Sequence, residues 1–358
     1  MKTIAIVISS LKAGGMERVA SELANNISCR DNLKVVLISL SNEDKFYELA
    51  SRVIYYPCQY NPMSSVASKA IRYISELRRA FRKFQPELVL SFGDRYNHFT
   101  LLASIGFAHR KFISNRQNPN LSNGKAVDFL NLLTYKWANG IIAQTQEAKR
   151  VVEEKYSAPN VEVIPNPIQL KKEASSHRDN VILNVGRFGD AKNQFELVEI
   201  FHEISNRENW NVHFFGDGLK RYSTEKSIQK FDLKEFVTIY PFTKNIDKEY
   251  QRSAIFAFVS RSEGFPNALA EAMAHGCACI SYDCTAGPAD IIDDGINGFL
   301  ISEGDHEMYK KKLSILMQDE QLRIRFGKAA REKTKQFDAE KITQSFLDFM
   351  LEGTTESH

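Results

Sequence analysis

The sequence lacks several features that would narrow its class at once. Every apolar stretch falls well below the roughly 20 residues that span a bilayer, so no transmembrane helix is predicted. Glycine (18) and proline (10) are not in excess among 358 residues, which excludes a collagen-like or low-complexity chain. Hydrophobic residues make up 43% and charged residues 25%, as in globular proteins, and the length predicts two domains.

Cysteine is also scarce. The five cysteines are an odd number without the spacing of a disulfide framework, and the first residues show no signal-peptide pattern, so we expect free thiols in a reducing cytoplasm. Cys277 and Cys279 stand in a strand-like segment and lack the CxxC spacing and further ligands of a zinc or redox site. The sequence contains no Asp-x-Asp pair. No metal site is therefore predicted.

The net charge of +3 hides an uneven distribution. Residues 1–170 carry 22 Lys and Arg against 14 Asp and Glu, or +8, whereas the remaining residues carry 25 against 30, or −5. A basic half favours nucleic acid or an anionic membrane, and the lack of a nucleic-acid-binding motif argues against the former. Residues 69–84 form a basic amphipathic pattern, whose apolar stripe we expect in the core and whose basic face could rest on anionic lipid.

Short apolar runs rich in β-branched residues recur along both halves of the chain. Such runs form strands buried on both faces of a parallel sheet, and the segments between them have helical periodicity. The sequence thus predicts an α/β fold of two Rossmann-like domains, 1–170 and 171–358, joined by a polar stretch. The last helix, about 338–351, is a candidate to pack back on the first domain. The expected strands are 3–9, 34–39, 88–92, 111–114, 140–143, 161–164, 181–185, 211–215, 236–240, 254–259 and 278–281.

Candidate phosphate-binding segments follow the expected strands. In open α/β sheets, ligands bind beyond the carboxyl ends of strands, so two facing domains would hold a ligand between them. Adjacent Gly14 and Gly15 begin an expected helix, where a phosphate could reach backbone N–H groups; a plain tight turn is the alternative. Arg187 and Lys192 lie on the loop after strand 181–185, and two cations on such a loop suit a diphosphate.

Residues 260–274 give the clearest indication of a binding site in the sequence. Glu263 precedes an expected helix and Glu271 lies in its second turn, a spacing that suits the hydroxyl groups of a sugar, although each Glu alone would more often be a solvated surface residue. Pro266 suits the first turn of a helix. Three backbone N–H groups after it would lack intrahelical partners and could hold a phosphate, namely those of Asn267, Ala268 and Leu269.

Taken together, these motifs resemble those of the family-4 retaining glycosyltransferases over nearly the whole chain. The resemblance implies a GT-B fold, a nucleotide-diphosphate-sugar donor held mainly by the C-terminal domain, an acceptor bound by the N-terminal domain, and no metal or other cofactor. The motifs are, in order, Gly14-Gly15-Met16-Glu17, Pro165-Asn166-Pro167, Gly186-Arg187 with Lys192, Gly216-Asp217-Gly218, Glu263-Gly264-Phe265-Pro266-Asn267 through Glu271, and Gly287-Pro288 with Asn297-Gly298.

The resemblance also implies residue roles. Arg187 and Lys192 would neutralise the donor diphosphate, while Glu263 would lie against the donor sugar and Glu271 would accept hydrogen bonds from the ribose. Catalysis would be mostly electrostatic, because stabilising the departing diphosphate favours an oxocarbenium-like centre. Further donor contacts are expected from Gly14, Gly15, Gly216, Gly264, Phe265, Asn267, Ala268 and Leu269, and base contacts from residues 240–243, including Phe242.

One position departs from the family pattern. Many members carry a His in the loop after the fifth N-terminal strand, where this chain has Arg116 in Ile-Ser-Asn-Arg-Gln-Asn-Pro (113–119). Arg116 could bind phosphate or sugar but could not act as a base, which leaves the proton acceptor unassigned, with a donor phosphate oxygen as a candidate. Asp94, Asn97 and His98 follow a strand and could contact either sugar or simply cap a loop.

Three functions are therefore weighed. The favoured one is a retaining transferase that moves a hexose or N-acetylhexosamine from a nucleotide-diphosphate sugar, with UDP inferred from the resemblance, to a lipid-linked glycan such as an undecaprenyl-diphosphate sugar at the inner face of the membrane. A nucleotide-sugar epimerase or hydrolase of the same architecture would turn over without acceptor. A non-catalytic binding module would not turn over, and the intact set of Arg187, Lys192, Glu263 and Glu271 argues against it.

Overall fold

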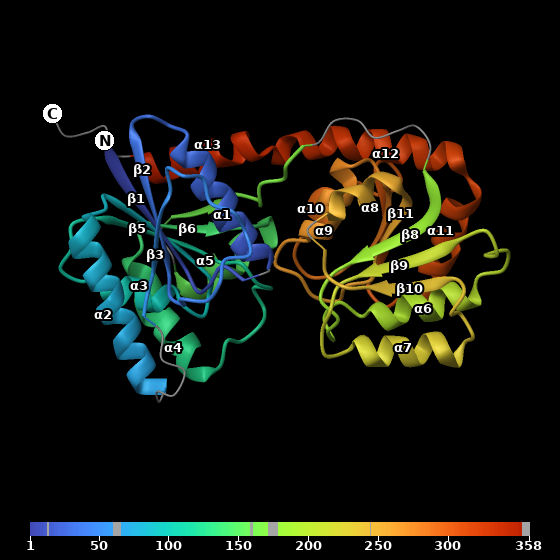
Figure 1. Cartoon of the computed structure of the whole chain (residues 1–358), viewed down its shortest axis with the longest axis horizontal. Coiled ribbons are helices and arrows are strands. Elements are labelled where there is room, and N and C mark those ends of the chain that lie inside the picture. Colours follow the sequence, from blue (N-terminus) through green and yellow to red (C-terminus); the bar gives the residue numbers. More distant parts are fainter. Residues whose placement is uncertain (13, 60–65, 158–159, 171–177, 244, 353–358) are drawn as a thin grey trace. The chain divides into compact units, whose positions relative to one another are not determined.

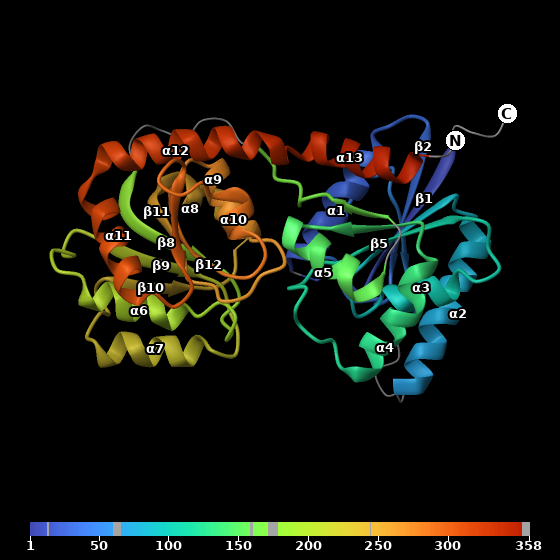
Figure 2. The same ribbon diagram turned by 180° about the vertical axis from the view of Figure 1, so that it is seen from behind.

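The chain forms two α/β units in its structure, a computed structural model that describes residues 1–12, 14–59, 66–157, 160–170, 178–243 and 245–352. One unit comprises Met1–Pro167 with Ala339–His358, and the other comprises Ile168–Asp338. Figures 1 and 2 show each unit as a sheet flanked by helices. The chain leaves the first unit three residues before the expected boundary and re-enters it at Ala339. Most of the expected polar linker (171–177) and of the tail (353–358) lies outside the described residues.

The first unit contains a parallel sheet in the order β3-β2-β1-β4-β5-β6-β7. Its apolar runs are buried on both faces, as the sequence predicts: Ile4, Ile6 and Ile8 face one core, and the alternate residues face another. The strands are β1 (Lys2–Ile8), β2 (Leu33–Ser39), β3 (Ile54–Pro57), β4 (Leu88–Phe92), β5 (Arg110–Ser114), β6 (Gly140–Ala143) and β7 (Val161–Val163).

The helices of the first unit cover both faces of its sheet. They are α1 (Gly15–Ser28), α2 (Val66–Phe84), α3 (Asn97–Ala103), α4 (Lys125–Thr134) with the short 3-10 helix η1 (Tyr135–Trp137), α5 (Gln146–Tyr156) and α13 (Ala339–Leu351). The apolar stripe of α2 packs into the core through Leu77 and Phe81, both fully buried, which confirms the expected core placement. Exposed cations on this helix include Arg79, Arg82 and Lys83.

The C-terminal helix α13 packs on the first unit although it follows the second in sequence. Its buried side chains Ile342, Phe346 and Leu347 join the same core cluster as Ile4 and Leu23 of β1 and α1. Figure 1 shows this red helix beside the blue α1. The amphipathic pattern of residues 339–351 thus buries its stripe against the opposite end of the sequence.

The second unit repeats the plan with the strand order β10-β9-β8-β11-β12-β13, all parallel. Its strands are β8 (Asp179–Val185), β9 (Asn211–Phe215), β10 (Val237–Tyr240), β11 (Ser253–Phe258), β12 (Ala278–Asp283) and β13 (Gly298–Ser302). Its helices are α6 (Gln194–Glu203), α7 (Arg221–Lys230), α8 (Ile246–Arg252), α9 (Asn267–Ala274), α10 (Pro288–Ile291), α11 (His306–Gln318) and α12 (Glu320–Thr334), followed by η2 (Lys335–Phe337).

Two strands were not expected from the sequence, and both lie at sheet edges. β3 (IYYP) is partly exposed and ends in a proline, which an edge strand tolerates because its outer N–H groups need no partner. β13 (GFLIS) begins with a glycine directly after Asn297. Neither has the continuous β-branched run that marks the central strands, so a pattern search for buried strands misses them.

Two further expectations from the sequence concern the cysteines and transmembrane helices. All five cysteines are free, and four of them are buried. Within the described ranges, none of the helices has both the length and the apolar composition needed to cross a bilayer.

The packing of α13 generates a stability prediction. Leu347 is 3% exposed in the first core, and replacing it with alanine removes buried methyl groups and leaves a cavity, at a cost of about 2–5 kcal/mol. In Leu347→Ala, hydrogen exchange followed by mass spectrometry should show faster exchange in β1 and β4 but not in β8 and β11. The exposed Gln344→Ala is the control on the same helix. Equal protection of β1 in both variants would contradict the placement of α13.

Candidate functional site

At the carboxyl edge of the second sheet, the loops after β8 and β9 are joined by backbone hydrogen bonds. The Gly186 N–H donates to the Phe215 carbonyl (3.0 Å), and the Phe188 N–H donates to the Asp217 carbonyl (2.9 Å). A Cβ on Gly216, whose φ is +154°, would lie 2.0 Å from the Gly186 carbonyl oxygen. The glycine turn after β9 is therefore required by close backbone approach, which fixes the loop that carries Arg187 and Lys192.

The loops after β11 and β12 join the same edge. The Arg261 N–H donates to the Ala191 carbonyl (2.8 Å), which links the β11 loop to the β8 loop. A β-bridge pairs Ser262 with Thr285 of the β12 loop. A Cβ on Gly287 would lie 2.4 Å from Pro266 Cδ, so this glycine also lets two loops touch. The sequence-predicted segments 186–193 and 260–274 thus form one surface.

Lys192 and Glu263 meet on this surface. The Lys192 ammonium lies 2.5 Å from Glu263 Oε1, and the side chains are 26% and 9% exposed, respectively. The same ammonium lies 5.0 Å from the centroid of the Phe258 ring. An ammonium has three N–H donors, so pairing with one carboxylate leaves others for an anion. Arg187, by contrast, is exposed.

Helix α9 presents its first turn beside this pair. The first i to i−4 bond runs from the Ala270 N–H to the Pro266 carbonyl (3.0 Å), so the amides of Ala268 and Leu269 precede the helical ladder. The Asn267 N–H also has no partner within the helix, but it donates to the Phe265 carbonyl in the preceding turn (2.9 Å). The glycine-containing turn lets Phe265 bury its ring against Phe337, which ties Gly264 and the start of α9 to the core.

Glu271 is held by a residue that sequence reasoning missed. The Tyr250 hydroxyl donates to Glu271 Oε2 (3.1 Å), and Tyr250 is fully buried on α8. Arg178 Nη1 donates to the backbone carbonyl oxygen of Tyr250 (2.8 Å). The His275 ring stacks on the Tyr250 ring, with the centroids 5.3 Å apart. No local motif surrounds Tyr250; only the packing of α8 against β11 and β8 brings it to Glu271.

The segment after β10 completes this edge. Tyr240 stacks on Phe215 with ring centroids 4.7 Å apart, and the Gly216 N–H donates to the Tyr240 carbonyl (3.2 Å). Phe242 follows two residues later with half of its side chain exposed. An aromatic surface, cations, a helix start and two carboxylates therefore lie along one sheet edge, which suits a base, a diphosphate and sugar hydroxyls.

In the first unit, Gly14 and Gly15 begin α1 as expected. Gly14 is extended, and the Tyr47 hydroxyl both donates to its carbonyl (3.0 Å) and accepts from its N–H (3.2 Å). A Cβ on Gly14 would lie 2.2 Å from Glu17 Oε2, so the glycine leaves room for this carboxylate over the helix start. Gly15 is exposed. A phosphate at this helix start would meet a carboxylate as well as amides.

Arg116 lies in a buried polar cluster of the first unit. Its guanidinium stacks on Phe92 at 4.5 Å and Nη1 donates to Asn166 Oδ1, whereas Nε and Nη2 are buried without a partner among the described residues. Burial lowers the pKa of Arg116 to about 9, so it remains a cation at neutral pH. An unpaired cationic edge is costly to bury, and an anion or hydroxyl would satisfy it.

Asp94, Asn97 and His98 are all buried and bonded within the first unit. Asp94 Oδ2 accepts from the backbone N–H of Arg116 (2.9 Å), and the side-chain amide nitrogen of Asn97 lies 3.3 Å from the Tyr135 hydroxyl. His98 Nδ1 lies 3.2 Å from Asn131 Oδ1. Of the two roles weighed for these residues, the geometry favours bracing the loop after β4 over direct contact with a sugar.

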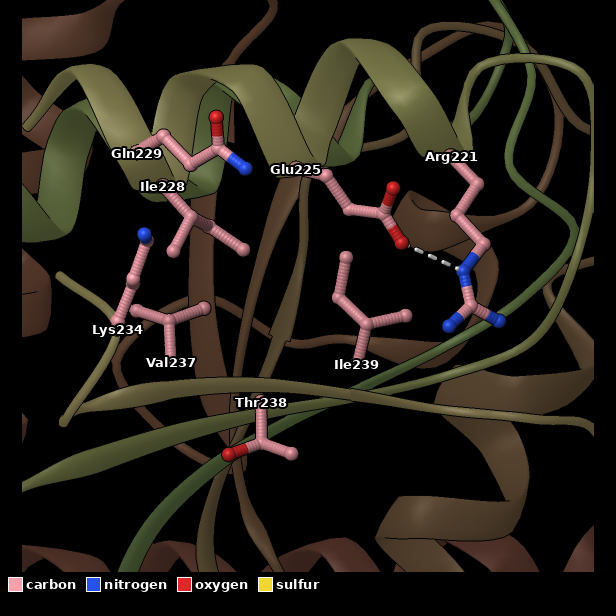
Figure 3. Close-up of a pocket in the computed structure, with 8 residues that line it drawn as sticks. All are labelled: Arg221, Glu225, Ile228, Gln229, Lys234, Val237, Thr238 and Ile239. Carbon is pink, nitrogen blue, oxygen red and sulfur yellow. Dashed lines mark hydrogen bonds and ion pairs between the residues drawn. The ribbon is translucent and has the colours of Figure 1, made fainter.

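A groove of about 270 Å³ lies elsewhere, between α7 and β10. Figure 3 shows its eight lining residues, with the Arg221 Nε donating to Glu225 Oε1 at 2.9 Å. This cation and this carboxylate already neutralise one another. All eight residues lie within 221–239, so the groove is separate from the loops described above.

Two family models match the chain in succession. Residues 13–172 match the model described as Glycosyltransferase Family 4, and residues 166–333 match the model described as Glycosyl transferases group 1. Together they span both units.

Full-length relatives and solved structures agree with these models. The chain is 27% identical to the amylovoran biosynthesis glycosyltransferase AmsD of Erwinia amylovora over 98% of this chain and 99% of the relative. It is 25% identical, over 98% and 99%, to a Campylobacter jejuni alpha-1,4-N-acetyl-D-galactosaminyltransferase whose name includes a PP-undecaprenol-linked glycan. The Anabaena Alr3699/HepE structure with UDP and glucose superposes with a TM-score of 0.80 at 16% identity, covering 97% and 99%. That last likeness establishes the fold alone.

The buried Asp94 generates a pH prediction. Burial raises its pKa from 3.8 to about 6, so the folded state binds this proton more tightly than the unfolded state. The resulting stabilisation is complete below about pH 4 and is lost as the pH rises through about 6. Asp94→Asn lacks this titration. The free energy of unfolding of the variant minus that of the wild type should therefore increase between these pH values.

Urea unfolding monitored through exchange of first-unit peptides measures this difference at each pH. Asp128→Asn, a carboxyl at the exposed start of α4, serves as the control, because burial contributes little there and its pKa is lowered by the Ser122 hydroxyl. A difference for Asp94→Asn that stays constant with pH would contradict the assignment.

Proposed function

This chain belongs to the family-4 glycosyltransferases with the GT-B fold, and we propose that it is a retaining enzyme that moves a hexose or N-acetylhexosamine from a nucleotide-diphosphate sugar to a lipid-linked glycan. The Lys192–Glu263 pair carries the donor side of this proposal. It lies beside the first turn of α9, on loops that are hydrogen-bonded to one another. We take the base to be uracil, the base of the UDP bound in the Anabaena structure of the same fold.

Each donor group has a matching position on the second sheet's carboxyl edge. Arg187 and Lys192 bind the diphosphate with the amides of Ala268 and Leu269, because charge-assisted bonds and a helix N-terminus both favour phosphate. Glu271, oriented by Tyr250, accepts the ribose hydroxyls. Glu263 lies against the donor sugar, and the base stacks near Phe242.

The reaction we propose needs no metal or other cofactor. The bond between the anomeric carbon and the diphosphate oxygen breaks, and its electron pair passes to the diphosphate, where the two cations stabilise the charge. The acceptor hydroxyl oxygen attacks the vacated face, and its proton passes to the departing phosphate oxygen. Arg116 stays a cation and serves by binding an oxygen with its unpaired N–H edge rather than as a base.

The acceptor is proposed from the relatives' names and from charge. Two Campylobacter jejuni relatives are named for diphospho-undecaprenol or PP-undecaprenol glycans, so we propose an acceptor of that class here. The +8 charge of residues 1–170 and the exposed cations of α2 would hold the enzyme on the anionic inner face of a membrane. The proposed localisation is thus cytoplasmic and peripheral.

Calorimetric titration with UDP, GDP and ADP in EDTA tests the donor site. The wild type should bind UDP selectively, and Glu271→Ala should weaken binding about 10- to 100-fold through lost charge-assisted bonds, whereas exposed Glu208→Ala should leave it unchanged. The proposed metal-free donor site would be contradicted if UDP bound only in the presence of a divalent cation, or if UDP did not bind at all. Hydrolysis or epimerisation of a UDP-sugar without any acceptor would favour the epimerase or hydrolase alternative.

Separate variants test the diphosphate contacts. Arg187→Ala and Lys192→Ala should weaken binding of UDP much more than that of uridine, because they remove contacts to phosphate alone. Lys248→Ala, an exposed cation on α8, is the control. Equal losses for UDP and uridine would show that the two side chains do not contact phosphate.

A further inference from the structure

The exposed side of α4 is apolar, unlike that of a typical surface helix. Three of its side chains have large exposed fractions: Phe129 at 59%, Leu132 at 49% and Leu133 at 41%. Leu121 just before the helix is 52% exposed, and Trp137, which continues the four-residue spacing after Phe129 and Leu133, is 40% exposed. Leucine, phenylalanine and tryptophan at helical spacing are the composition of helices that lie in a membrane interface. We call these five residues the α4 face.

The opposite side of α4 fixes this orientation. Asn131 is fully buried, and its Nδ2 donates to the Asp94 carbonyl (2.9 Å) while its Oδ1 faces His98. Thr134 and Tyr135 are buried as well. The helix therefore cannot turn its apolar side inward without exposing Asn131 and breaking the buried network. Figures 1 and 2 place α4 at an outer edge of the first unit.

Within residues 121–137, which carry the α4 face, two lysines stand against one aspartate. Lys125 and Lys136 are exposed at the two ends of α4, and Arg95 is exposed and joined to Asn123 (3.3 Å). The single acidic residue between 121 and 137 is Asp128, whose carboxylate accepts from Ser122 Oγ (2.5 Å) and from the Asn123 N–H (3.1 Å). Cations thus flank an apolar surface, which complements anionic headgroups over acyl chains.

We propose that the α4 face docks on an anionic lipid bilayer, with Phe129, Leu132, Leu133 and Trp137 in the interface and Lys125 and Lys136 at the headgroups. This inference rests on the proposed lipid-linked acceptor and names the surface that reaches it. The apolar stripe of α2 packs into the core, so α2 offers a membrane its cations and a single strongly exposed apolar side chain among its described residues, Ile71 at 70%. A symmetric dimer through the α4 face would bring two sets of lysines together, which disfavours a second copy as the occupant.

Vesicle binding by the full chain tests the proposal. The probes are vesicles of phosphatidylglycerol and phosphatidylcholine (about 1:3) and of phosphatidylcholine alone, at low and high salt. Phe129→Gln/Leu132→Gln/Leu133→Gln should lower the partition coefficient for the anionic vesicles at least about tenfold. Ile296→Gln/Ile324→Gln, exposed apolar side chains of the second unit at 64% and 39%, is the matched control and should bind as the wild type does.

Tryptophan fluorescence gives a second measurement that does not depend on the triple variant folding. The chain has two tryptophans, and Trp210 is 5% exposed in the core of the second unit. On vesicle binding, Trp137 emission should shift to shorter wavelength and be quenched by brominated acyl chains. Trp137→Phe should abolish both changes while circular dichroism stays the same. Binding by the wild type without these changes would overturn the docking of this face.

The outcomes separate this inference from the proposed function. If the triple variant binds vesicles as well as the wild type, the α4 face is not the docking surface, while attachment through the cations of α2 stands. If the wild type does not bind vesicles at all, both docking and peripheral attachment fail, and UDP binding still tests the transferase. Ultracentrifugation could instead show that the wild type is a dimer and that the triple variant is a monomer. If the triple variant then bound vesicles as the wild type does, the α4 face would join two copies of the chain, and the proposal would be overturned.

Discussion

Close backbone approach at the carboxyl edge of the second sheet is the constraint on which the candidate site depends. Gly216 lies against the Gly186 carbonyl, and Gly218 lies against Phe188 in the same way, with a Cβ placed 2.3 Å from its carbonyl oxygen. Any side chain at these glycines would push the β8 and β9 loops apart. The loop that carries Lys192 is also bonded to the loop that carries Glu263. Cation, carboxylate and helix start are therefore held together before any ligand binds, which lowers the cost of binding.

The two carboxylates of this edge have different surroundings, and this difference separates their roles. Glu263 is paired with Lys192, so it positions a cation. Glu271 accepts a hydrogen bond from the hydroxyl of the fully buried Tyr250, which orients the carboxylate. In the first unit, Arg116 lies near aromatic rings of both β4 and α13, so the last helix of the chain helps to form the buried polar cluster around Arg116.

Helix α4 connects the interior of the first unit with its surface. Its buried side supplies Asn131, which contacts Asp94 in the loop after β4 and His98 on α3, while its other side exposes phenylalanine and leucine. A lipid surface that holds α4 would therefore also hold the loop that braces Arg116. The burial of Asp94 beside this helix gives the same region a dependence on pH.

The sequence by itself determined the α/β class, the central strands and the loops at their ends, because buried parallel strands need continuous apolar runs and the loops need glycine, proline and charge at fixed offsets. It also indicated Lys192, Glu263 and Glu271 as candidate site residues. Only the tertiary structure decided the edge strands β3 and β13 and the contact between Tyr250 and Glu271. The same holds for the burial of Asp94, Asn97 and His98 and for the exposure of the α4 face. The physical reason is that periodicity shows which side of a helix is apolar, whereas only packing decides whether that side meets the core.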